Sequence, residues 1–158
     1  MSTEIATEEN YAQTYRSIEI ILNNYNNQKA DIWAVGCVFY ELVTGQVLFD
    51  IPNYSNKLIQ NSEHLHNIFT ITEDSNKKDI IENSLLKDVY FTETNNLNYR
   101  NTAVEPDIHV YKLKNLITEN SKIECDINEL YNFMTLFFIY KQNMRPDSYT
   151  LLNHNYLS

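Results

Sequence analysis

The sequence predicts a mainly α-helical protein wrapped round one buried central helix at about residues 31–44. Apolar residues recur at helical spacing in several segments, and no segment alternates convincingly with the two-residue period of a strand. The segment 31–44 is apolar on nearly every side, and such a helix lies inside a domain rather than on its surface. With 158 residues, of which 43% are hydrophobic, the chain can bury one sizeable core.

The predicted central helix carries apolar residues all round its axis. These residues are Ile32, Trp33, Val35, Cys37, Val38, Phe39, Leu42 and Val43. Asp31 is placed to cap the first turn, and Gly45 is placed to end the helix in a left-handed conformation. We therefore expect the rest of the chain to pack around this helix.

Apolar periodicity predicts further helices along the chain. They are expected at about residues 17–22, 62–69, 79–87, 109–118, 127–140 and 147–153. Ser17 is able to cap the first of them. The remaining segments are rich in polar turn formers and are expected to be irregular.

Composition narrows the classes of partner and compartment. The net charge is −9, which argues against a nucleic-acid partner and permits a basic protein or peptide. Cys37 and Cys125 are too few and too far apart for a disulfide framework or a zinc site. Residues 1–10 do not resemble a signal peptide, and the longest apolar stretches fall short of the ~20 residues of a membrane span. We predict an intracellular protein, cytoplasmic or nuclear, with no membrane or metal site.

Three segments carry short motifs in a fixed order. They are YRSIE at 15–19, DIWAVGC at 31–37 followed by ELVTG and LF at 41–45 and 48–49, and NMRP at 143–146 followed by LLNHNYL at 151–157. Together they resemble the later conserved blocks of eukaryotic protein kinases: the end of the activation segment, the central helix of the helical lobe, and the closing block. Ile18, where most of the family has proline, is similar to the SR-protein kinases of the CMGC group. Residues 64–68 and 90–97 look like the intervening helix and insert of those kinases.

The resemblance implies that residues 1–158 form one partial kinase domain, a helical lobe without the N-terminal lobe and the catalytic loop. It also implies that Glu19 pairs with Arg145, since a buried carboxylate and guanidinium are tolerated only as a pair. The family residue matching Asp31 accepts hydrogen bonds from the backbone of the catalytic loop. The plainer alternatives are a simple helix cap for Asp31 and a solvated surface charge for Arg145.

The same resemblance assigns Tyr15, Arg16 and Ser17 to the substrate-binding loop, and an ordinary surface arginine is the alternative for Arg16. Ala12 stands where the family has a threonine that bonds the catalytic aspartate, so the loop departs from the family pattern. Acidic residues farther along the chain are candidates for docking a basic Arg/Ser-rich peptide, and a solvated charged face is the plainer interpretation. These candidates are Glu73, Asp74, Asp79, Glu82 and Asp88.

The residues for phosphoryl transfer are missing from the sequence. Transfer from ATP needs a phosphate-covering glycine-rich loop, a lysine, a catalytic aspartate with its asparagine, and a metal-binding aspartate. The chain has two glycines, and neither His-Arg-Asp nor Asp-Phe-Gly occurs. We expect no catalytic residue and no cofactor in this chain, although a complete family member would use ATP and magnesium. His64 and His66 lack the acids or cysteines of a metal site and are expected at the surface.

Two functions of different classes are compatible with these observations. The first is a C-terminal fragment of a serine/threonine kinase that is inactive by itself. The second is a non-catalytic, pseudokinase-type interaction module that binds a kinase or its basic substrate. In both, the lobe face that a complete kinase covers would be exposed, so we expect self-association through that face. A helical scaffold with an accidental resemblance is the third interpretation.

Overall fold

A computed structural model describes residues 12–22, 24, 28–98 and 112–157. Its α-helices are α1 (Ile18–Ile21), α2 (Lys29–Thr44), α3 (Lys57–Ile71), α4 (Lys77–Glu82), α5 (Lys87–Tyr90), α6 (Leu113–Asn120), α7 (Ile127–Thr135) and α8 (Ser148–Leu152). Short 3-10 turns are η1 (Gln13–Tyr15), η2 (Leu136–Phe138) and η3 (Asn155–Leu157). Within these ranges no strand forms, and the one isolated bridge pairs Phe91 with Leu97. The predicted mainly α-helical fold class is confirmed.

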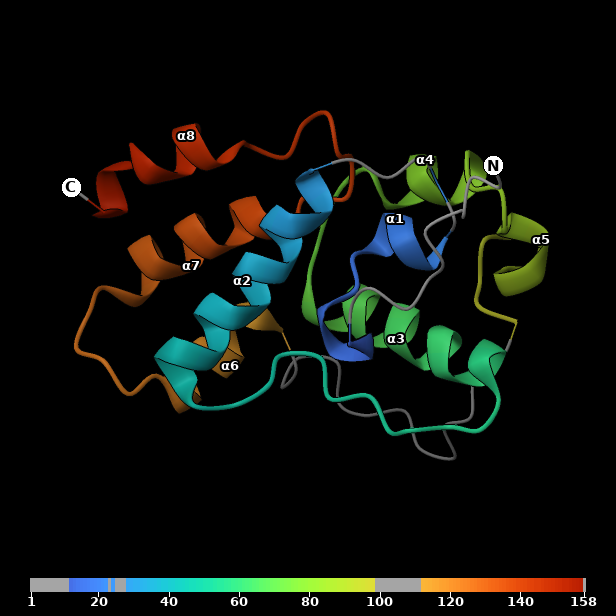
Figure 1. The fold of residues 1–158 in the computed structure, drawn as a ribbon, viewed down its shortest axis with the longest axis horizontal. Helices are drawn as coiled ribbons and strands as arrows, with labels where there is room; N and C mark the ends of the chain where they lie inside the picture. The colour runs from blue at the N-terminus through green and yellow to red at the C-terminus, as the bar shows by residue number, and fades with distance from the viewer. Residues whose placement is uncertain (1–11, 23, 25–27, 99–111, 158) are drawn as a thin grey trace, which may run out of the picture.

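The longest helix, α2, runs through the middle of the molecule (Figure 1). Helices α6, α7 and α8 lie on one side of it, and α1, α3, α4 and α5 lie on the other (Figure 1). Direct packing partners of α2 include α6 and the turns η1 and η2. In the described parts of the chain, no helix is long and apolar enough to cross a membrane.

The central helix is buried along one face only. Trp33 and Cys37 are fully buried in the core, whereas Val35, Val38 and Leu42 are exposed, Leu42 by 75%. The three exposed residues recur at the spacing of one helical face. The expectation that this helix is buried on every side is therefore wrong, because no described segment covers this face.

The ends of α2 differ in part from the prediction. The helix begins at Lys29 with Gln28 at its N-cap, so Asp31 lies in the first turn and is not the cap. A carboxylate in that turn still interacts favourably with the helix dipole. Gly45 ends the helix with a φ of 72°, the left-handed conformation that the sequence predicts.

An aromatic cluster joins the two sides of the molecule at Trp33. Its indole stacks on Phe49 with ring centroids 6.0 Å apart and meets the edge of Phe138 at 5.2 Å. Tyr140 lies 6.5 Å away. The four rings come from α2, from the loop after it and from the segment after α7, so the core is assembled from distant parts of the sequence.

Other helices also differ from their predicted bounds. The helix predicted at 127–140 ends at Thr135, and η2 takes over at Leu136–Phe138. α3 begins five residues earlier than expected, because the side chain of Asn56 accepts hydrogen bonds from the backbone N–H groups of Leu58 and Ile59. The segment expected as one helix at 79–87 forms α4 and α5, separated by a turn in which the Ser84 hydroxyl accepts from the Leu86 N–H. α6 begins at Leu113, and the predicted residues 109–111 lie outside the described ranges.

Candidate functional site

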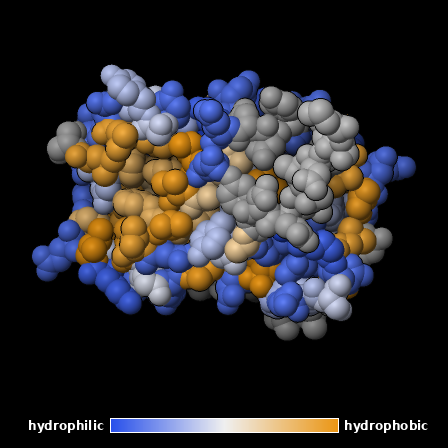
Figure 2. Space-filling view, in the orientation of Figure 1, coloured by the Kyte–Doolittle hydropathy of each residue, from blue (hydrophilic) through white to orange (hydrophobic). Residues whose placement is uncertain are grey.

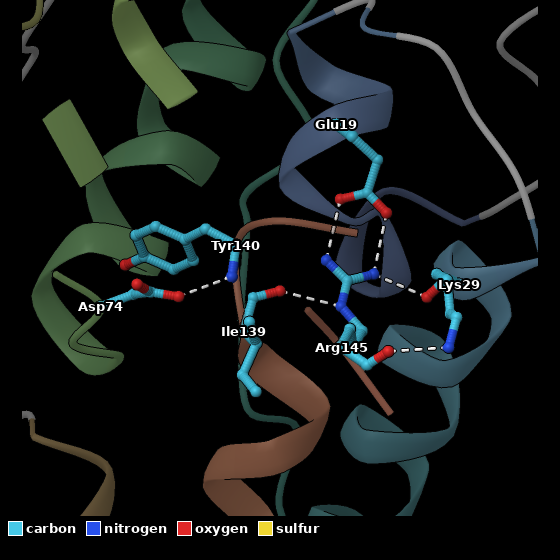
Figure 3. Close-up of polar contacts among 6 residues, drawn as sticks. All are labelled: Glu19, Lys29, Asp74, Ile139, Tyr140 and Arg145. Atoms are coloured by element: carbon cyan, nitrogen blue, oxygen red, sulfur yellow. Dashed lines mark hydrogen bonds and ion pairs between the residues drawn. The ribbon is translucent and has the colours of Figure 1, made fainter. Parts of the chain in front are cut away.

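Arg145 lies at the centre of the most strongly connected polar site in the described structure. Its guanidinium donates to both carboxylate oxygens of Glu19, with Nη1–Oε1 and Nη2–Oε2 distances of 2.8 and 3.0 Å (Figure 3). Nη1 also donates to the Lys29 carbonyl at 2.6 Å, and Nε donates to the Ile139 carbonyl at 2.9 Å. The predicted contact between Glu19 and Arg145 is thus present, across 126 positions of sequence.

This pair is completely removed from solvent. The side chains of Glu19 and Arg145 are both 0% exposed, which excludes the alternative of a solvated surface arginine. The guanidinium also lies over the Trp33 ring, with its Cζ atom 5.1 Å from the ring centroid. A buried charge is tolerated when its hydrogen bonds are satisfied, and the bidentate pairing with two further carbonyl acceptors meets that condition.

Lys29 closes the site from the start of α2. Its Nζ atom donates to the Arg145 carbonyl at 2.7 Å, while its own carbonyl accepts from the Arg145 guanidinium. We use the name clamp for Glu19, Lys29 and Arg145. The clamp ties together α1, the first turn of α2 and the segment before α8.

The predicted substrate loop, Tyr15–Ser17, begins at the last residue of η1 and ends at the N-cap of α1, which carries Glu19 of the clamp. Arg16 is only 6% exposed and Ser17 is fully buried, so the alternative of an ordinary surface arginine is wrong. Ser17 stands at the N-cap of α1, but its side chain makes no capping hydrogen bond. The pKa of Tyr15 is raised, chiefly by its interaction with the Glu41 carboxylate, with burial as a smaller cause.

The remaining residue of the kinase motif, Asp31, is exposed on α2. It lies two residues from Lys29 in sequence, at the same end of the helix as the clamp. Its assignment to the backbone of a catalytic loop stays a prediction.

The acidic candidates are engaged in local contacts. Asp74 accepts from the backbone N–H groups of Asn76 and Tyr140, at 2.7 Å each, and so fixes the chain entering α4 (Figure 3). The other pairs are Glu73–Lys112, Asp79–Lys141 and Glu82–Lys78, and Asp88 lies in the first turn of α5. Paired carboxylates offer less negative charge to a ligand, so these contacts favour the interpretation as a solvated or structural face.

An acidic groove that the sequence did not reveal lies beside α3. Its volume is about 310 Å³, and it runs between α3, the loop 46–50 and Leu116 of α6. Asp50 and Glu63 line it together with Tyr40 and Ile71. Among the described lining residues there are two carboxylates and no lysine or arginine. The two acids lie 13 positions apart in unremarkable sequence, so only the fold brings them together.

His64 is a second residue whose position differs from the prediction. It is 0% exposed, and its ring packs against Phe49 with centroids 5.4 Å apart, so the expectation of a surface histidine is wrong. Burial, and secondarily the cation of Arg16, lower the pKa of His64 to about 3. The signal that could have indicated this is the helical spacing of His64 with Leu65 and Ile68 on the buried face of α3.

Both glycines have structural roles at α2. Gly36 lies inside α2, where a Cβ atom would overlap Phe137. Gly45 ends α2 in the left-handed conformation beside Lys122.

Comparison with known proteins identifies the family of this chain. The family model described as "Protein kinase domain" matches residues 1–157. A probable dual specificity protein kinase YAK1 homolog of Encephalitozoon cuniculi is 27% identical over 143 residues, covering 90% of this chain and 33% of the relative. The serine/threonine-protein kinase SKY1 of Saccharomyces cerevisiae is 26% identical over 144 residues, covering 90% and 18%.

A shorter match is the mitogen-activated protein kinase p38b of Drosophila melanogaster, 42% identical over 60 residues, which cover 37% of this chain and 14% of the relative. The chain thus spans a third or less of the relatives it matches. These relatives are kinases of the CMGC type, in agreement with the resemblance that the three motifs carry. The motifs, the helical fold and the matched family model lead to one conclusion: this chain belongs to the protein kinase family.

Proposed function

We propose that this chain is the C-terminal part of the helical lobe of a serine/threonine protein kinase similar to the SR-protein kinases, and that it transfers no phosphate by itself. The buried clamp is the single observation that best supports this function, because it fixes the substrate loop to the far end of the lobe. Neither glycine forms a phosphate loop, and the sequence holds neither catalytic triplet.

The exposed face of α2 supports the proposal that further kinase structure is needed for activity. Val35, Val38 and Leu42 present a row of aliphatic side chains to solvent. Figure 2 shows apolar side chains gathered over α2 and α7 on this face of the molecule. A patch of that kind marks a contact surface. We assign it to the part of a kinase domain that precedes the activation segment.

A phosphotransfer assay tests this function directly. The purified chain, mixed with labelled ATP, magnesium and an Arg/Ser-repeat peptide, should incorporate no label above a protein-free control. The yeast relative SKY1 serves as the positive control for the reagents. Incorporation by the chain alone would refute the proposed inactivity.

Complementation tests the assignment of the exposed face. The remainder of the SKY1 kinase domain, supplied as a separate polypeptide, should bind this chain, and Leu42→Lys should weaken that binding because it places a charge in an apolar contact. Tyr149→Lys, at a 77%-exposed position on α8, is the matched control and should leave binding unchanged. Equal binding by both variants would remove the face of α2 from the proposal.

A non-catalytic module that binds a basic peptide is the second candidate, and the acidic groove beside α3 favours it. Asp50 and Glu63 line the groove together with the aliphatic side chains of Ile71 and Leu116. A groove lined by both carboxylates and aliphatic side chains suits an arginine, whose stem is apolar and whose head is cationic.

Fluorescence anisotropy with a labelled Arg/Ser-repeat peptide tests this groove. The double substitution Asp50→Asn with Glu63→Gln should weaken binding roughly tenfold or more at low salt. The matched control is Asp79→Asn with Glu82→Gln, which alters the same charge on α4. A larger loss in the control than in the groove variant would return the docking site to the acidic stretch that the sequence first suggested.

A further inference from the structure

A network of polar side chains connects η1, whose last residue begins the substrate loop, to the buried face of α3. Gln13 lies at its centre. The Gln13 Nε2 atom is 3.1 Å from Asn61 Oδ1 and 3.1 Å from His64 Nδ1, and Lys57 Nζ is 3.2 Å from Gln13 Oε1. Asn61 continues the network through its Nδ2 atom to the Tyr90 hydroxyl at 2.9 Å. Three segments, η1, α3 and α5, therefore meet in one hydrogen-bonded unit.

The direction of each hydrogen bond follows from the chemistry of the groups. An ammonium only donates, so the atom of Gln13 that faces Lys57 is the amide oxygen. The Gln13 NH₂ group must then donate to Asn61 and to His64. Nδ1 of His64 is thereby an acceptor, and the imidazole is the neutral tautomer with its proton on Nε2.

The surroundings of His64 hold it in this neutral state. The ring is 0% exposed and packs against Phe49. Arg16, directly after η1, and Lys57, at the start of α3, are the nearby cations, and Arg16 disfavours a positive charge on the ring. Nε2 finds no hydrogen-bond partner within the described structure, so Gln13 makes the polar contact of this imidazole.

The turn η1 is held from two sides. Gln13 bonds to α3, and η1 also packs against α2. We propose that Gln13 is a positioning residue that latches the substrate loop Tyr15–Ser17 onto α3 through the neutral Nδ1 atom of His64. The proposal rests on the proposed function in taking Tyr15–Ser17 as the substrate loop.

The tautomer of His64 in the unmodified chain gives the first test. Long-range proton–nitrogen correlation spectra of the ¹⁵N-labelled chain distinguish an imidazole protonated at Nε2 from one protonated at Nδ1. The expected spectrum at pH 7 shows His64 with its proton on Nε2. A proton on Nδ1 would overturn the proposal without the need for any variant.

Two substitutions of Gln13 separate a positioning role from a merely structural one. Gln13→Leu removes the donor to Nδ1 and should change the His64 nitrogen signals. Gln13→Glu replaces the donor by an acceptor, so His64 should take up a proton at a pH about 1–3 units higher, because a nearby carboxylate favours the charged imidazole. If neither variant alters the nitrogen signals or the protonation of His64, Gln13 does not hold the substrate loop through His64.

His154 provides an internal reference for the fold. Its Nδ1 accepts from the Tyr156 N–H at 3.1 Å, far from η1 in sequence, so its signals should stay constant in both variants. Gln28→Leu is the matched substitution, since Gln28 is exposed and makes no capping side-chain bond. It should leave His64 as in the unmodified chain.

Amide hydrogen exchange tests whether the contact between Gln13 and His64 holds the substrate loop in place. The Tyr15 and Arg16 amides donate to Ala12 and Gln13 within η1, and they should exchange roughly tenfold faster in Gln13→Leu, because the lost side-chain bonds hold η1 in place. Unchanged exchange there would show that Gln13 does not position the loop. These measurements need no phosphotransfer, so their failure is distinguishable from failure of the proposed function.

Discussion

At the scale of single residues, the clamp shows how a charge can be kept inside a small helical protein. Arg145 donates to one carboxylate and two backbone carbonyls, and Glu19 receives both of its carboxylate bonds from that one side chain. The attraction within the pair offsets the cost of removing both ions from water only while both are present. Loss of either partner leaves a buried charge without compensation.

We therefore expect Arg145→Ala to lower the free energy of unfolding by about 3–5 kcal/mol. Lys141→Ala is the matched control, because Lys141 pairs with Asp79 at 2.9 Å near the surface, and such pairs contribute only about 0–1 kcal/mol. Urea denaturation of both variants gives the two values. A double-mutant cycle of Arg145→Ala with Glu19→Ala should be strongly non-additive, and additive effects would show that the two residues do not interact.

His64 should make the stability of the chain depend on pH. Its pKa is about 3 in the folded chain against an ordinary value near 6.5, so between these values the unfolded chain binds more protons. The free energy of unfolding must then fall as the pH falls, by about 2–3 kcal/mol from this residue at pH 4.5. His64→Leu removes this contribution. From pH 7 to pH 4.5 the free energy of unfolding of the unmodified chain should therefore fall relative to that of His64→Leu. Parallel curves of this free energy against pH for the two proteins would contradict the assignment.

The sequence predicted the Glu19–Arg145 pair of the clamp, but neither the part of Lys29 in it nor the groove, for a physical reason. Glu19 and Arg145 each lie inside a motif with distinctive neighbours, so their pairing could be predicted across most of the chain. Asp50 and Glu63 have no such neighbours, and their proximity depends on how α3 packs beside the loop after α2. His64 was predicted at the surface because its polarity was weighed above its spacing with Leu65 and Ile68. Its hydrogen bond with Gln13 could not be foreseen from the sequence.

At the scale of helices, Gly36 decides how closely η2 approaches α2. Phe137 and Phe138 from η2 pack on the side of α2 where Gly36 has no side chain, and Phe138 meets the edge of Trp33 there. The close approach of the two elements is therefore permitted by the missing Cβ atom. A helix-favouring alanine would gain intrinsic propensity at this position but lose the contact.

Gly36→Ala should destabilise the chain by about 1–3 kcal/mol, the usual cost of overpacking, in spite of the better helix propensity of alanine. Val35→Ala, on the exposed face of the same helix, is the control and should change stability by no more than about 0.5 kcal/mol. Thermal and urea unfolding report both effects. A Gly36→Ala variant as stable as the unmodified chain would mean that η2 can move away at no cost.

Helix existence was easier to predict than helix extent. The apolar period identified α2, α3 and α7, but it could not locate the start of α3, where Gln60 and Asn61 are buried in spite of their polarity. Their burial depends on partners in other segments, such as the Tyr90 hydroxyl for Asn61. Helix prediction from apolar periodicity uses apolar residues only. It therefore misses a helical turn whose buried residues are polar and hydrogen-bonded.

At the scale of the whole molecule, the exposed face of α2 should govern association. Val35, Val38 and Leu42 remain in solvent, and apolar patches of this kind drive self-association. Sedimentation velocity should show a mass that rises with concentration, and Leu42→Lys should lower the fraction associated. Leu85→Lys, a 77%-exposed residue between α4 and α5, is the control and should behave as the unmodified chain. A strict monomer at high concentration would count against this prediction.

The clamp also has a consequence for the order of events during synthesis on the ribosome. Glu19 emerges from the ribosome 126 residues before Arg145, and in that interval the carboxylate has no buried cation to pair with. Burying it alone would be costly, so α1 must stay solvated while α2, α3 and α7 are already available for local structure. The core can then be completed only when the segment containing Arg145 is available. The Glu19–Arg145 contact joins residues far apart in the sequence, so it forms late. A nascent chain stalled before Arg145 should accordingly be protease-sensitive near Glu19, and one stalled well beyond it should be protected.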